Sequence, residues 1–159
     1  MFGSGFIGNT RDVPQQPSTP EALSELCGEY LRILGTWQFP AVSTSVRAAR
    51  HSVAESLAPH TFAGAEDAVL VVSELVTNSV VHAASTVTVT LELWERAFRL
   101  VVDDVHPDVP ELSDVDVDVD VDADSGRGLG IIEAVALAWG SETNNTGKRL
   151  WAAFATHSY

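Results

Sequence analysis

The strongest secondary-structure pattern of this chain lies in the segment Ala65-Glu-Asp-Ala-Val-Leu-Val-Val-Ser-Glu-Leu-Val-Thr-Asn-Ser-Val-Val-His82. Its apolar residues recur every three or four positions, which predicts a helix over about residues 65–81 with one face against a sheet. The residues of that face are Ala68, Val69, Val72, Leu75, Val76 and Val80.

The same helix carries a polar ridge. Glu74, Asn78 and His82 are spaced four residues apart, so their side chains follow one another along the helix surface. A carboxylate and a carboxamide one turn apart suit a general base and a ligand for Mg²⁺, which prefers oxygen donors. A solvated helix face has the same spacing, so the ridge alone does not identify a site.

Two strands are expected after this helix. Residues 86–94 alternate polar and apolar side chains, the period of a half-buried strand, and residues 97–103 form a second apolar run. Glu95-Arg96 is short enough for a hairpin turn, so the two strands should be antiparallel. Farther along, the pattern predicts a helix over 131–137 and a last strand over about 150–156.

Before residue 65, the pattern predicts a short strand over 36–39 that Pro40 ends. A helix should follow, with Ser43 or Ser45 as its cap, and should continue to Leu57.

The first part of the chain is expected to lie outside the main domain. Residues 1–19 are rich in Gly, Pro, Ser, Thr and Gln, which predicts a flexible tail. Residues 20–34 have apolar positions at helical spacing, and Gly35 should end this amphipathic helix. Its apolar stripe must dock on the domain or on a partner.

The order of these elements predicts an α/β (α+β) fold. We expect a two-layer sandwich in which helices cover one face of a mixed or antiparallel sheet. The chain then divides into the tail (1–19), the N-terminal amphipathic helix (20–35) and one domain (36–159).

The composition restricts location and partners. The chain has 159 residues, with 22 acidic and 9 basic side chains and a formal net charge of −13. This charge argues against nucleic acids and anionic membranes as partners. The single cysteine, Cys27, excludes an internal disulfide and fits a reducing compartment. No apolar run approaches the roughly 18 residues that span a bilayer, so we expect a cytoplasmic protein.

Two further segments carry groups that could bind a ligand. Val101-Val-Asp-Asp104 closes a strand, where a carboxylate can accept a hydrogen bond from an exocyclic amine. Ser125-Gly-Arg-Gly-Leu-Gly130 leads into a helix, where glycines, free N–H groups and Arg127 suit a phosphate. A flexible hinge has the same composition.

The segment between them, residues 114–124, alternates Asp with Val or Ala. Carboxylates along one strand face repel one another, so we expect a mobile loop, with weak cation binding as an alternative.

Together these segments resemble the GHKL superfamily of ATP-binding domains, whose Bergerat fold is shared by histidine kinases, gyrase-type ATPases and bacterial anti-sigma-factor serine kinases. The segment from Ser73 to His82 is similar to the N box, and Val102-Asp-Asp-Val-His-Pro107 and Gly126-Arg-Gly-Leu-Gly130 are similar to the glycine boxes. Four more segments resemble the stand-alone anti-sigma-kinase-like branch of this superfamily. They are Phe39-Pro40, Ala49-Arg50, Trp139-Gly140 and Gly147-Lys-Arg-Leu-Trp151. The resemblance covers about residues 36–156.

By position, this resemblance implies a site for ATP and Mg²⁺. Glu74 would be the base that activates the attacking hydroxyl, Asn78 the Mg²⁺ ligand, and Asp104 the partner of the adenine amine. A loop over about 108–125, which contains the acidic segment, would be the lid. The phosphates would lie near His82 and be bound by Gly126, Arg127, Gly128, Leu129 and Gly130.

The sequence departs from the family pattern at two places. His106 and Asp108 stand where much of the superfamily has glycines after the adenine-binding strand. Arg149 stands where a small hydroxyl residue is usual.

The implied function is that of an anti-sigma-factor-like protein serine/threonine kinase. It would phosphorylate an anti-anti-sigma antagonist and sequester a sigma factor, as a homodimer formed through the strand edge at Trp37. The alternative is a non-catalytic scaffold that binds a partner with or without nucleotide. The altered glycine positions favour the scaffold, whereas Glu74 and Asn78 favour the kinase.

Overall fold

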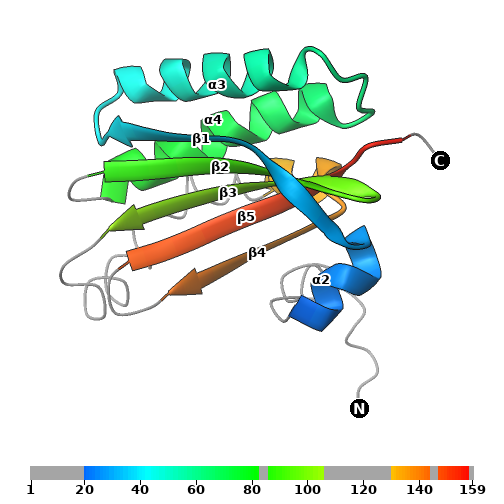
Figure 1. Ribbon diagram of the computed structural model, residues 1–159. Helices are drawn as coiled ribbons and strands as arrows, with labels where there is room; N and C mark the ends of the chain where they lie inside the picture. Colours follow the sequence, from blue (N-terminus) through cyan, green and yellow to red (C-terminus); the bar gives the residue numbers. More distant parts are fainter. Residues whose placement is uncertain (1–19, 83–85, 106–129, 144–146, 158–159) are drawn as a thin grey trace.

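The computed structural model describes residues 20–82, 86–105, 130–143 and 147–157 (Figure 1). The strands of these residues form one five-stranded antiparallel sheet in the order β1-β2-β3-β5-β4. Residues 130–135 form a helix. The other elements are α2 (Pro20–Cys27), β1 (Tyr30–Pro40), α3 (Thr44–Leu57), α4 (Ala65–His82), β2 (Thr86–Trp94), β3 (Ala97–Val105), β4 (Ala138–Thr143) and β5 (Gly147–Ala155).

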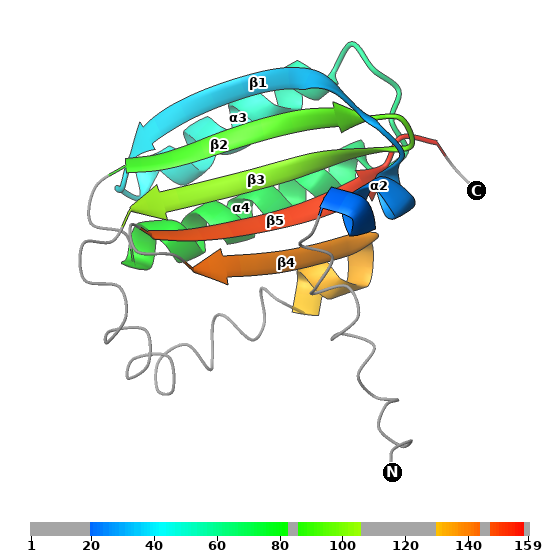
Figure 2. The ribbon, with the colours of Figure 1, turned by 60° about the horizontal axis from the view of Figure 1, so that its bottom comes forward.

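Helices α3 and α4 cover one face of the sheet (Figures 1 and 2). The apolar face predicted for α4 packs there, with Val72 and Val76 fully buried. The alternation of β2 supplies the facing surface, because Val87, Val89 and Leu91 are also fully buried while the threonines between them are half-buried. The prediction of a two-layer α+β sandwich is confirmed, with α3 and α4 as its helical layer (Figure 1).

The predicted hairpin and the predicted helix before residue 58 are also confirmed. β2 and β3 pair antiparallel around the turn at residues 95–96. The residue before α3 is Ser43, whose side chain makes no cap hydrogen bond, whereas the Ser45 hydroxyl donates to the Pro40 carbonyl at 2.6 Å.

The prediction of one helix over residues 20–34 is wrong, because α2 ends at Cys27. Gly28 has a φ of 84°, in the left-handed region that glycine adopts readily, and its N–H donates to the Ser24 carbonyl at 2.8 Å. This helix end lies inside the stretch whose apolar spacing suggested continuous helix.

Residues after Gly28 form β1, which is much longer than the strand predicted over 36–39. β1 pairs along its length with β2, with Trp37 opposite Val89 and Phe39 opposite Val87. Pairing with β2 satisfies the backbone groups of these residues, whereas a short isolated helix is only marginally stable because its nucleation is costly. Tertiary contacts therefore override the helical spacing.

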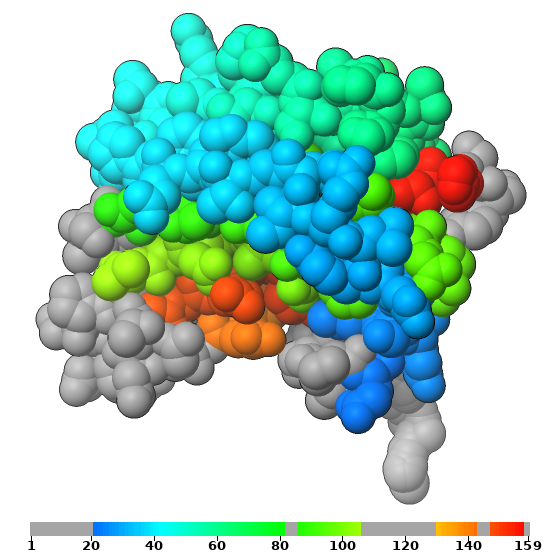
Figure 3. All heavy atoms as spheres, in the orientation of Figure 1, coloured from blue at the N-terminus to red at the C-terminus, as the bar shows by residue number. Residues whose placement is uncertain are grey.

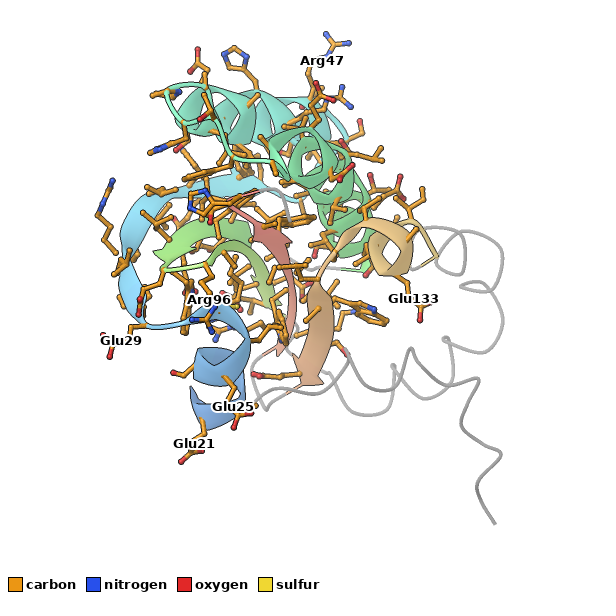
Figure 4. The ribbon with its side chains drawn as sticks, turned by 90° about the vertical axis from the view of Figure 1, so that its right-hand side faces the viewer. Glu21, Glu25, Glu29, Arg47, Arg96 and Glu133 are labelled. Carbon is orange, nitrogen blue, oxygen red and sulfur yellow. The ribbon has the colours of Figure 1, made fainter. Side chains whose placement is uncertain are left out.

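The apolar stripe of α2 docks on the domain itself. Leu23 and Cys27 pack against the sheet face opposite α3 and α4, at one end of the strands (Figure 2). Arg96, in the β2–β3 turn, donates from Nη2 to the Glu25 carbonyl at 2.8 Å and points toward α2 (Figure 4). The residues beneath α2 are Trp94, Ala97, Val101, Ala138, Trp151 and Ala153.

The end of the chain contains a strand that the hydropathy pattern did not predict. The helix expected over 131–137 stops at residue 135, and the Leu137 N–H donates to the Ala153 carbonyl at 2.8 Å. β4 then pairs with β5, so the Trp139-Gly140 motif lies in an edge strand. β5 begins at Gly147, three residues before the strand start that the pattern predicts.

The predicted tail (1–19) and the acidic loop (108–125) lie outside the described residues. Within the described part of the chain, no helix is long and apolar enough to cross a membrane.

Two leucines of α2 provide a matched test of its docking. Leu23 is 6% exposed and Leu26 is 36% exposed. We expect Leu23→Ala to lower the free energy of unfolding by about 2 kcal/mol, because it leaves a cavity beneath the helix. Leu26→Ala should change it by about 0.5 kcal/mol or less. Urea unfolding followed by tryptophan fluorescence measures both, and equal losses would contradict docking of this face.

Candidate functional site

Helix α4 places the predicted polar ridge beside one end of the sheet. Glu74 and Asn78 are both half-buried, one helical turn apart. Within the described residues, the Glu74 carboxylate makes no hydrogen bond or ion pair, which leaves it available to a ligand. The side chain of His82, for which a place near the phosphates was predicted, lies outside the described part of the structure.

Two neighbouring aspartates at the end of β3 face opposite sides of the sheet. Asp103 lies on the face away from α3 and α4, where its Oδ1 accepts a hydrogen bond from Arg149 Nε at 2.7 Å. Asp104 therefore points to the helix side, and it is only 4% exposed. Of the two, Asp104 is the one positioned for a ligand between the sheet and α4.

Pairing with β5 brings a lysine to Asp104. Lys148 is the cross-strand partner of Asp104, and its Nζ donates to Asn78 Oδ1 at 3.3 Å. Residues from α4, β3 and β5 thus meet at one end of the sheet. The predicted residues Asn78 and Asp104 are brought together through a side chain that the sequence reasoning missed.

The sequence contained a signal for Lys148. In β5 the side chains that face the helices belong to Lys148, Leu150, Ala152 and Phe154, so a lysine begins an otherwise apolar face. A charged residue at such a position needs a partner or a function. Finding its partners required the strand register, which depends on contacts far apart in the chain.

The electrostatics of this cluster reflect its partial burial. Burial lowers the pKa of the Lys148 ammonium from its ordinary value, and the negative charge of Asp104 opposes that shift. Unlike Lys148, Arg149 has its side chain on the sheet face away from α3 and α4, where it pairs with Asp103. The departure noted at Arg149 in the sequence is therefore outside the site.

Gly147 permits the close approach of β5 to the end of β3. A Cβ atom on Gly147 would collide with the backbone carbonyl oxygen of Asp104. Any other residue here would push the two strands apart next to Lys148 and Asp104.

The glycine loop is described only at its last residue. Gly126, Arg127, Gly128 and Leu129 lie outside the described residues, and Gly130 is exposed at the start of the helix over 130–135.

A separate surface depression lies at the start of α3 and contains none of the predicted site residues. Arg47 points from it into solvent (Figure 4). Its lining consists of Ser43, Thr44, Val46, Arg47 and Arg50.

The donor set fits a nucleotide better than a resident divalent cation. Within the described residues, no group of three or more His, Cys, Asp or Glu side chains could hold a metal ion. Asn78 offers a carboxamide oxygen that Mg²⁺ accepts, but the Lys148 ammonium already donates to that oxygen. Mg²⁺ fits this position only if Lys148 moves. By contrast, a buried carboxylate at the end of β3 suits an amine donor.

Comparison with known proteins agrees with this geometry. Residues 39–154 match the histidine kinase-like ATPase domain, which supports the resemblance to the GHKL superfamily and implies ATP binding. A comparison with curated protein sequences gave no match. The family match spans most of the chain and includes Glu74, Asn78, Asp104 and Lys148. The chain therefore belongs to the histidine kinase-like ATPase domain family.

Proposed function

We propose that this protein binds ATP at the end of the sheet marked by Asn78 and Asp104 and transfers the terminal phosphoryl group to a serine or threonine of a partner protein. The observation that most directly supports the proposal is the meeting of α4, β3 and β5 at this end. There Lys148, opposite Asp104 in the sheet, hydrogen-bonds to Asn78.

Asp104 would select the base. A buried carboxylate accepts a hydrogen bond from the exocyclic amine of adenine, whereas the carbonyl oxygen of guanine at the same place would repel it. Because guanine would set a carbonyl oxygen against the buried carboxylate where adenine offers an amine, the site should discriminate strongly between the two bases.

Glu74 and Asn78 would act on the phosphate end. Glu74 lies one turn before Asn78 on α4 and would accept the proton of the attacking hydroxyl. Asn78 would hold Mg²⁺, which when bound neutralises charge on the phosphates. Transfer would then depend mainly on positioning and on charge neutralisation.

The partners follow from the resemblance to anti-sigma-factor kinases. The phosphorylated protein would be an anti-anti-sigma antagonist, and a sigma factor would compete with it for the same protein. The net charge of −13 supports a partner with a basic contact surface.

A specific observation favours the second candidate function, that of a non-catalytic scaffold. The Asn78 oxygen that a kinase would use for Mg²⁺ is engaged by Lys148. If that contact persists when nucleotide is present, the fold would bind a partner without phosphoryl transfer.

The adjacent aspartates allow a matched test of ATP binding. We expect Asp104→Asn to weaken ATP binding at least about tenfold in calorimetric titration with Mg²⁺, because it removes a hydrogen bond to a charged group. Asp103→Asn, on the other face, should bind as the wild type does. Glu74→Gln should retain affinity but lose ATP turnover, measured as ADP release, by about 10²-fold or more.

Two results would contradict the kinase. Equal effects of Asp103→Asn and Asp104→Asn on ATP affinity would mean that adenine binds away from Asp104. A wild-type protein that binds no ATP at millimolar concentration would support the nucleotide-independent scaffold.

We also propose that β1 forms the contact between two copies of the chain. β1 is an edge strand, so its outer backbone groups can pair with another strand. Leu31 and Ile33 are 52% and 51% exposed on it, and β1 lies open on the molecular surface (Figure 3). Exposed apolar side chains on a free strand edge are typical of an interface.

Sedimentation velocity tests this contact. The wild type should sediment as a dimer and Ile33→Lys as a monomer, because a buried ammonium in the interface is costly. Leu70→Lys is the control, since Leu70 is similarly exposed, at 46%, on α4. A monomeric wild type, or a dimer that Ile33→Lys leaves intact, would contradict the proposal.

A further inference from the structure

The candidate nucleotide site contains a positively charged side chain, that of Lys148. Lys148 and Arg149 are adjacent in β5 and lie opposite Asp104 and Asp103 in β3. The two cations face opposite sides of the sheet, and Lys148 is the one that contacts α4, through Asn78. The Lys148 ammonium thus contacts Asn78, the residue that the resemblance assigns to Mg²⁺.

Asn78 Oδ1 cannot bind Mg²⁺ closely while it accepts the hydrogen bond from the Lys148 ammonium. Mg²⁺ binds its oxygen ligands at about 2.0–2.1 Å. The Lys148 ammonium lies 3.3 Å from Asn78 Oδ1 and is half-buried, where repulsion between like charges is weakly screened. Lysine is itself an effective phosphate ligand, and its four-carbon stem lets the ammonium move over several ångströms.

We propose that Lys148 is a nucleotide-binding residue whose ammonium contacts the phosphates of ATP and replaces much of the contribution of Mg²⁺ to binding. This inference rests on the proposed ATP site. It assigns Lys148 a role beyond tethering Asn78, and it predicts ATP binding that persists without a divalent cation.

The test is a calorimetric titration of ATP into the full-length protein, once with Mg²⁺ and once with EDTA. The wild type should lose no more than about threefold in affinity when Mg²⁺ is removed. Lys148→Met keeps the apolar stem and removes the charge, so it should bind ATP at least about tenfold more weakly in EDTA. Mg²⁺ should restore much of that loss, because Asn78 Oδ1 is then released from Lys148. Lys148→Arg should retain binding in EDTA.

Arg149→Met is the matched control. It removes the neighbouring cation from the opposite face, and its ATP affinity should equal that of the wild type under both conditions. Thermal unfolding of each variant separates a binding defect from a folding defect.

The outcomes distinguish this inference from the proposed function. Wild-type binding that requires Mg²⁺, or Lys148→Met binding that equals the wild type in EDTA, overturns the role of Lys148 and leaves the ATP site standing. A wild type that binds ATP under neither condition refutes both. The wild-type titration needs no variant, so a Lys148→Met protein that fails to fold does not prevent the test.

Discussion

The antiparallel register between β3 and β5 is the constraint on which the candidate site depends. It sets Lys148 opposite Asp104 on the helix side and Arg149 opposite Asp103 on the other side. A shift by one residue would exchange these faces, because side chains alternate along a strand. Gly147 permits this register at the site, since a side chain there would collide with the Asp104 carbonyl.

The two faces of the sheet have different roles. On the helix side, the core between α3, α4 and the strands ends at the polar cluster around Asn78. On the other face, α2 covers one end, and Arg99 lies 5.9 and 5.4 Å from the ring centroids of Trp94 and Trp151. Arg99 also donates from Nε to Glu92 at 2.8 Å. Its charge is therefore used within the fold, whereas that of Lys148 is directed toward the candidate site.

Local patterns in the sequence were sufficient for α3, α4 and the β2–β3 hairpin, because each has a clear period and a defined turn. They failed over residues 20–34, where helical spacing continued past Gly28 although residues after it pair with β2. They also missed β4, whose partner is β5. For the candidate site, the sequence predicted roles for Asn78 and Asp104 but none for Lys148, because only long-range strand pairing brings Lys148 to them.

The most direct test of the central claim is a titration of ¹⁵N-labelled protein with a nonhydrolysable ATP analogue, followed by backbone amide shifts. An ATP site formed by α4, β3 and β5 predicts shift changes at Asn78, Asp104 and Lys148, with little change in α2. Changes confined to α2 or to the depression at the start of α3, with Asn78 and Asp104 unaffected, would contradict it.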